Sequence, residues 1–363
     1  MNNNKYFVLS LLISLFSFVS CNSDSDTNGG DFDYDVTTVL TDWVNEAIVP
    51  EITSAKTTTD HLVSAFETFE TDQTLENFTA LKEAYFNAYL SFQIIEKYNF
   101  DTAENISFSG FLNSYPVNST QIDTYIASGT FSAETLESSV LQKDKQGFPA
   151  LDYLFNGLGT TETENFEALT TQHIDYISAV INRISSLTTE VSNSWDEEAK
   201  AAFISNTSSS LSGSMNIVFD RYVTNFERKI REAKVSIPAG VRSVETQPSK
   251  IESLYGSELS KDLLQEAFEG FESFYLGAND SMSFSDLLQG IGRSDIDLKM
   301  KEYIATIFEK ISAIDPDLKL QVETDALKLV EIHDAMQSLV GVLKTDIKSS
   351  LSLSIITQDN DGD

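Results

Sequence analysis

Residues 78–95 read FTALKEAYFNAYLSFQII, and the spacing of their apolar side chains indicates a helical protein. The apolar residues recur at alternating intervals of three and four: Phe78, Leu81, Tyr85, Ala88, Phe92 and Ile95. This period places them on one face of a helix, whereas a half-buried strand alternates with a period of two. We therefore expect a long helix with an aromatic-rich apolar face, which is more often core than a platform for stacking sugars.

The same period recurs through the rest of the chain. Further stripes begin at Ile174, Met215, Leu263 and Ile304, and a last one is predicted to run through Val322, Ala326, Val330, His333, Val340, Leu343 and Ile347. Runs of period two are nearly absent, so the sequence predicts an all-α fold of packed helical bundles. Proline and glycine clusters interrupt the helices at 115–116, 147–149, 157–159, 237–240 and 290–292. A division of the body near 157–164 or near Pro238 fits these breaks.

The first residues predict export and a lipid anchor. A positive Lys5 precedes the apolar run Tyr6 to Val19, which ends in small residues before Cys21. The run is short for a transmembrane helix, which needs about 20 residues. This pattern resembles a bacterial lipoprotein signal over 1–20, with lipid attached to Cys21; the alternative is an ordinary secretory signal that a cysteine follows by chance. We expect the protein in the cell envelope, at the surface or the periplasmic face of the outer membrane.

The predicted organisation follows from composition. Residues 21–35 are acidic and poor in apolar side chains, which predicts a flexible tether. The helical body is expected over 36–350, and an acidic tail over 351–363. The chain has 24 Lys and Arg against 56 Asp and Glu, a net charge of −32, which argues against nucleic acid as a partner. Cations suit such a surface, although solubility alone also explains it. The one cysteine leaves none for disulfides.

Common catalytic motifs are missing from the sequence. It has no His-Glu-x-x-His, no Gly-x-Ser-x-Gly and no glycine-rich phosphate loop. His61 and His173 fall at expected helix starts, and His333 falls on an apolar stripe. The closing DNDGD at 359–363 lacks the downstream glutamate of a calcium loop, which favours a solvated tail.

Residues 146–157, QGFPALDYLFNG, resemble the signature of imelysin-like proteins, Gly-x-His-x-x-Glu followed by an apolar helix. Other stretches agree in order: 81–100 with the family's first aromatic helix, 113–116 with the loop before the signature, and 227–240 with a Glu-x-x-x-Arg-x-x-Lys-Val-x-Ile-Pro-Ala-Gly segment. The resemblance implies a two-lobed all-α body in the bacterial envelope, with the signature lining a cleft between the lobes. The family is classed with metallopeptidases, and its relatives include iron-uptake components.

This chain departs from the signature at two positions. Gly147 matches, but Pro149 stands at the histidine position and Asp152 at the glutamate position. Proline supplies neither a metal ligand nor a proton, and one carboxylate cannot hold zinc, which takes three protein ligands in catalytic sites. Proline suits the first turn of a helix, and aspartate there favours the helix dipole. The cofactor stays open: a metal cation is the candidate, and Asp152 is its candidate ligand.

The resemblance also marks Glu227, Arg231 and Lys234 as polar residues that could line the cleft beside Asp152, with Glu96 and Tyr115 as further candidates. Glu227 and Arg231 are four residues apart, a spacing that stabilises a helix without any function.

Two functional classes follow from these observations. We favour a non-enzymatic binding or accessory lipoprotein of the cell envelope, linked to uptake of iron or another metal cation, whose partners are the membrane through Cys21 and a cation or an envelope protein. The alternative is a metal-dependent peptidase of the imelysin type, which needs replacement ligands near Asp152. A surface glycan-binding lipoprotein is a third reading, although the chain has only two tryptophans.

Overall fold

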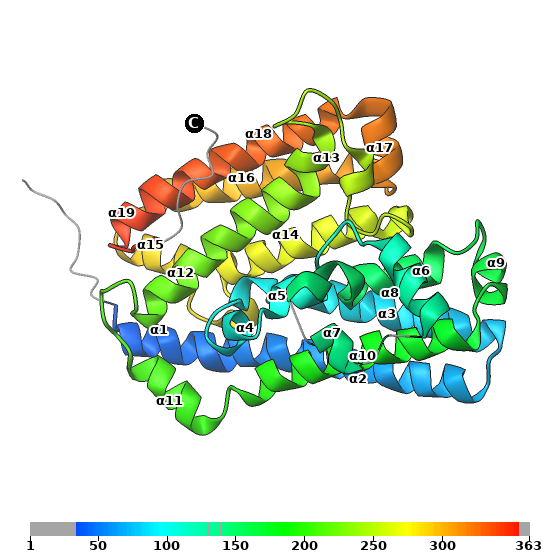
Figure 1. Ribbon diagram of the computed structural model, residues 1–363. Helices are drawn as coiled ribbons and strands as arrows, with labels where there is room; N and C mark the ends of the chain where they lie inside the picture. Colours follow the sequence, from blue (N-terminus) through cyan, green and yellow to red (C-terminus); the bar gives the residue numbers. More distant parts are fainter. Residues whose placement is uncertain (1–33, 130, 132, 138–139, 356–363) are drawn as a thin grey trace, which may run out of the picture.

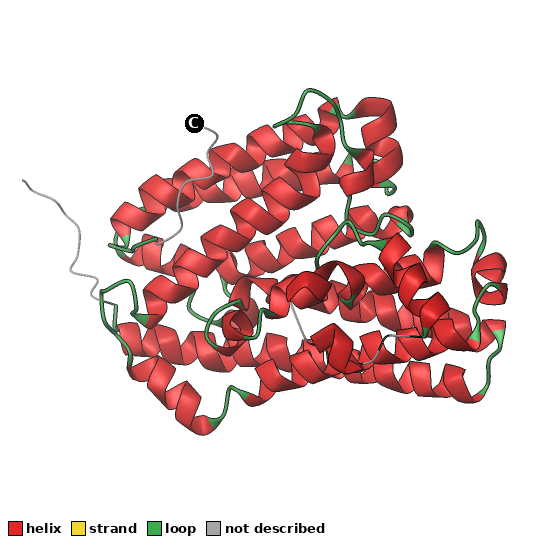
Figure 2. Cartoon of the chain, viewed as in Figure 1, coloured by secondary structure: helices red, strands yellow, loops and turns green. Residues whose placement is uncertain are grey.

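The computed structural model describes residues 34–355 except 130, 132, 138 and 139. Every regular element in this part of the chain is helical, and none is a strand (Figure 2). The prediction of an all-α fold is confirmed. Cys21, the signal and most of the tether lie outside the described residues, as does the end of the tail.

The first half of the fold is built from helices that begin directly after the tether. They are α1 (Val36–Asp42), η1 (Trp43–Ile48), α2 (Val49–Thr71), α3 (Leu75–Ile95), η2 (Glu96–Tyr98), α4 (Thr102–Asn105), α5 (Phe108–Leu112), α6 (Ser119–Ser128), α7 (Ala133–Glu137), η3 (Val140–Lys145), α8 (Gly147–Asn156), α9 (Glu162–Glu167), α10 (Thr171–Asn193) and α11 (Glu197–Ser205).

The second half follows a serine-rich loop. Its helices are α12 (Ser214–Thr224), η4 (Asn225–Ser236), α13 (Ile237–Ala239), η5 (Pro248–Lys250), η6 (Ser257–Leu259), α14 (Ser260–Leu276), η7 (Ala278–Asp280), α15 (Phe284–Gly290), α16 (Ser294–Ser312), α17 (Leu318–Asp325), α18 (Leu327–Gly341), η8 (Val342–Ile347) and α19 (Lys348–Ser350). The segments η1, η4 and η8 are π-helical and continue α1, α12 and α18 without a break.

Two bundles share one continuous core (Figure 1). In the first bundle α2 packs on α3 and α10, and α10 packs on α8; in the second, α18 packs on α16 and η4. Helix α14 lies against both α3 and η4 and so joins the bundles. Side-chain caps at Thr74 and Thr170 begin α3 and α10 by accepting hydrogen bonds from backbone N–H groups of the first turn.

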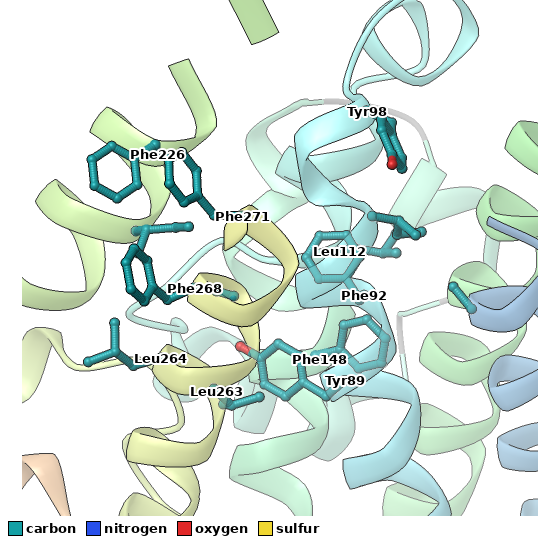
Figure 3. Packing of buried hydrophobic residues seen from close by; sticks show 14 of the residues in the cluster. Tyr89, Phe92, Tyr98, Leu112, Phe148, Phe226, Leu263, Leu264, Phe268 and Phe271 are labelled. Carbon is teal, nitrogen blue, oxygen red and sulfur yellow. The ribbon is translucent and has the colours of Figure 1, made fainter. Parts of the chain in front are cut away.

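The predicted stripes of 78–95 and 174–191 are buried along their whole length. Aromatic rings fill the contact between the bundles (Figure 3). On one side the ring of Tyr89 stacks on Phe148 with centroids 4.6 Å apart; on the other, Phe271 stacks on Phe268 at 5.7 Å and packs against Phe226 at 4.5 Å. The first aromatic stripe therefore serves the core.

The last predicted stripe is wrong in its middle. Val330 and His333 are only half-buried, whereas Leu329, Ile332 and Met336 are fully buried. The cause is a break at Ala326 between α17 and α18, which resets the helical phase.

The body extends slightly past its predicted end. Leu351 and Leu353 are buried, and the backbone N–H of Ser354 donates to Asn216. None of the described helices combines the length and the apolar character that crossing a bilayer demands.

Gly147 offers a test of how α8 is seated. Its φ is +74°, and a Cβ there would lie 2.3 Å from the carbonyl oxygen of Leu112 and 2.5 Å from that of Phe111. We expect Gly147→Ala to lower the free energy of unfolding by more than about 1 kcal/mol, measured by chemical denaturation, because alanine meets both an unfavourable φ and a clash. Gly129→Ala is the control, since Gly129 has a φ of +60° with no heavy atom within 4 Å. Equal losses in the two variants would contradict the close packing of Gly147.

Candidate functional site

Helix α8 carries the signature and is buried from Gly147 to Phe155. Pro149 occupies the first turn, where a missing N–H costs no helical hydrogen bond. Phe148 beside it stacks on Tyr89 of α3. The helix is therefore held by packing on its first turn, and Asp152 follows one turn later.

Asp152 is 1% exposed and accepts four hydrogen bonds. The backbone N–H of Tyr255 donates to Oδ2 at 2.9 Å. The backbone N–H of Gly256 donates to Oδ1 at 2.8 Å, and the side chains of Ser253 and Asn156 donate to the same oxygen at 3.1 Å. The carboxylate thus ties α8 to the segment 252–256, which precedes α14.

Burial raises the pKa of Asp152, while the hydrogen bond from the Tyr255 backbone and then those from Asn156, Gly256 and Ser253 lower it. The group is surrounded by donors that belong to the protein itself. Within the part of the chain that the structure describes, none of its hydrogen-bond donors is a basic side chain, and none belongs to a second carboxyl group.

Glu252, the first residue of segment 252–256, is the centre of a second buried cluster. It is 2% exposed, and its Oε1 accepts from the Tyr89 hydroxyl at 2.9 Å, the Gln93 amide at 3.0 Å and the Asn113 amide at 2.7 Å. Its Oε2 accepts from the ammonium of Lys234. The cluster joins α3, the loop after α5 and η4 around one carboxylate.

Lys234 is also 2% exposed and donates to Oε1 of Gln93 at 2.8 Å. Burial lowers the pKa of Lys234, an effect that the Glu96 carboxylate opposes and the Lys229 ammonium reinforces. Of the residues carried over from the family pattern, Lys234 is the one whose contacts reach the segment that binds Asp152.

Glu227 and Arg231 point elsewhere. Oε1 of Glu227 lies 4.0 Å from the Arg231 guanidinium and 3.3 Å from the ammonium of Lys344 in η8. Arg231 donates to Gln337 in α18. These contacts are thus with helices of the second bundle, and the predicted pairing at four residues is present.

Glu96 and Tyr115 line a pocket of about 620 Å³ between the two bundles. Its wall comes from Glu96 in η2, residues 113–116 after α5, one face of η4 and the first residue of α13, and the loop that follows. The last three parts contribute Arg228, Lys229 and Ala233, then Ile237, then Gln247 and Lys250. Asn113 connects this pocket to the buried cluster, because its side chain both lines the pocket and donates to Glu252. Four predicted candidates therefore lie in the region where the bundles meet. The pocket contains Glu96 and Tyr115, the buried cluster contains Lys234, and segment 252–256 contacts Asp152.

A resident metal ion does not fit the described residues. Nowhere in that part of the chain do three or more His, Cys, Asp or Glu side chains converge to hold one. Both oxygens of Asp152 already accept hydrogen bonds, and His333 is bonded to Ser236 through Nδ1 at 2.6 Å. The histidine prediction for α10 is confirmed, since His173 completes the capping box at its start, whereas His61 lies inside α2 and not at its beginning. A metal at Asp152 stays a prediction that its surroundings do not support.

Glu252 was not found from the sequence. It sits in an irregular segment between Pro248 and Gly256, where no periodicity marks a buried position. One signal was available. Lys234 belongs to the segment 227–240 that resembles the family pattern, and a lysine buried in a helix needs an acidic partner elsewhere in the chain.

The contact between Lys234 and Glu252 can be tested with a double-mutant cycle. We expect Lys234→Met and Glu252→Gln each to lower the free energy of unfolding by about 3 kcal/mol or more, because each leaves a buried polar partner unsatisfied. The double variant should lose clearly less than the sum of the single losses. The exposed pair Lys310 and Glu331, 3.0 Å apart, is the control and should lose less than about 1 kcal/mol in the same cycle. Additive losses at Lys234 and Glu252 would show that the two groups act independently.

Comparison with solved structures identifies this architecture. The crystal structure of a protein described as an iron-regulated protein A precursor, from Parabacteroides distasonis, matches with a TM-score of 0.72 and 19% identity over 87% of this chain and 94% of that chain. That of an imelysin-like protein from Psychrobacter arcticum matches with a TM-score of 0.70 and 15% identity over 90% of this chain and 99% of that one. At identities this low, the two matches show a shared fold and nothing more.

The sequence comparisons place the chain in a family. No curated protein sequence matches it. The family model described as Imelysin (Peptidase_M75) matches residues 48–345, which include the signature helix, the buried cluster and the pocket. The chain belongs to the imelysin family.

Proposed function

We propose that this protein is a non-enzymatic binding or accessory lipoprotein of the bacterial cell envelope that serves iron uptake. The observation that carries the proposal is the state of Asp152. Its two oxygens accept four hydrogen bonds from the protein, and Pro149 stands where the family signature has a histidine. A carboxylate whose two oxygens are occupied in this way stabilises the contact between α8 and segment 252–256, and it does not act as a general base that activates water.

The rest of the region supports binding. The pocket of about 620 Å³ beside the buried cluster is of the size that small-molecule sites have, and its wall mixes apolar and charged side chains. The description of the Parabacteroides structure as an iron-regulated protein supports the link to iron. The lipoprotein-like signal ending at Cys21 supports a role at the membrane.

The function is tested by iron accumulation and by hydrolysis. We expect a strain that lacks this gene to accumulate less iron under iron limitation, measured with a radioactive iron isotope, and the intact gene to restore it. The purified mature protein should cleave no member of a mixed peptide library, with or without added zinc. Unchanged accumulation in the deletion strain would contradict the iron role. Chelator-sensitive cleavage that is lost in Asp152→Ala, but kept in the exposed control Asp175→Ala, would instead establish the peptidase alternative.

The anchor is tested by fractionation. We expect the wild-type chain to be found with the membranes of the native host and Cys21→Ala to be released from them, because lipid attachment needs the thiol. Immunoblots of the fractions measure this. Equal membrane association of the two forms would show that Cys21 does not anchor the protein.

A further inference from the structure

The pocket between the bundles has a charge opposite to that of the chain. It is lined by the three cationic side chains of Arg228, Lys229 and Lys250 and by one carboxylate, that of Glu96. The whole chain carries a net charge of −32. A concave positive region on such an anionic protein focuses negative ligands locally and sets the pocket apart from its surroundings.

The single carboxylate in the pocket is already engaged. Glu96 is 3% exposed, accepts a hydrogen bond from the hydroxyl of Ser109, and lies 3.2 Å from the ammonium of Lys229. Its charge is therefore balanced by Lys229 within the protein. Two cations remain in the pocket wall.

Arg228 and Lys250 are these two cations. Arg228 is exposed and Lys250 is half-buried, and within the described part of the chain neither makes an ion pair or a side-chain hydrogen bond. Acidic residues outnumber basic ones 56 to 24 in this sequence, so carboxylate partners are abundant. Two unpaired cations facing one pocket thus leave a positive charge available to a ligand.

A neutral hydroxyl and a fixed amide complete the wall. Burial, and after it the Glu96 carboxylate, raises the pKa of Tyr115 above its ordinary value, so its hydroxyl keeps its proton and can donate. The Asn113 amide is held by Glu252 and Tyr89, which fixes the side of the pocket next to the buried cluster. Planar guanidinium and ammonium groups with a hydroxyl donor match the oxygens of carboxylates and phosphates.

We propose that this pocket binds a compact multivalent oxyanion, a small molecule that bears carboxylate or phosphate groups. The inference rests on the proposed function, because it takes the pocket as the ligand site and names the chemistry of the ligand. A polycarboxylate that chelates iron has this chemistry. Such a ligand would connect the protein with iron through the chelator, with no need for protein side chains to coordinate the metal.

Calorimetric titration of the purified mature protein with citrate and with inorganic phosphate tests the inference. We expect saturable binding of at least one of them at low ionic strength, weakened by added salt. Arg228→Gln and Lys250→Gln should each weaken binding about tenfold, since each removes one charge-assisted contact. Arg228→Lys should lose less, because it keeps the charge.

Lys348→Gln in α19 is the matched control, since Lys348 is a half-buried lysine outside the pocket, and it should leave binding unchanged. Circular dichroism checks that each variant is folded. Absence of binding by both anions, or binding that the pocket variants do not weaken, would overturn the oxyanion inference. Neither result changes the outcome of the iron accumulation experiment. A failure of the oxyanion inference can therefore be distinguished from a failure of the proposed function. The tighter of the two anions identifies the group that the pocket prefers.

Discussion

The burial of two carboxylates beside one short segment fixes where the two bundles of this fold can meet. Asp152 and Glu252 are each exposed by 2% or less, and a buried charge is costly unless donors surround it. Segment 252–256 donates hydrogen bonds to Asp152, which belongs to the first bundle. Glu252 of the same segment accepts hydrogen bonds from α3 and from Lys234 of η4. The two bundles must therefore meet at this place and in this orientation for either charge to be satisfied.

The same constraint divides the polar side chains of this region into those that hold the structure together and those that are free to contact a ligand. A side chain that completes a buried network is held by its partners and has little capacity left for a ligand, which is the condition of Asp152, Glu252 and Lys234. The cations Arg228 and Lys250 stand a short way along the same inter-bundle region and are not consumed by it. Binding is consequently expected at the rim of the network and not within the signature itself. This division explains how the helix at the position of the family signature can lie in the core while the open pocket lies next to it.

The sequence predicted the helices well because their signal is local. The stripes along 78–95 and 174–191 face the core as their period required, and the glycine and proline breaks at 147–149 and 237–240 fall at helix boundaries. The π-helical turns and the phase shift at Ala326 were not predictable in this way, since they depend on packing against neighbouring helices. Glu252 shows the same limit at the site: its partners lie 18 to 163 residues away, and no spacing in the chain encodes those contacts.

The substitution of Asp for Glu at position 152 fits the geometry of the segment that it binds. Gly256 approaches so closely that a Cβ on it would lie 3.0 Å from Oδ1 of Asp152 and 2.7 Å from the side-chain amide of Asn156. A glutamate at 152 would push its carboxylate one methylene further into this space and would displace the backbone N–H groups of Tyr255 and Gly256. The shorter acid and the glycine are thus two halves of one contact. Since Pro149 stands where the signature histidine would share a proton or a cation with this acid, the geometry of Asp152 serves the packing of α8 against segment 252–256.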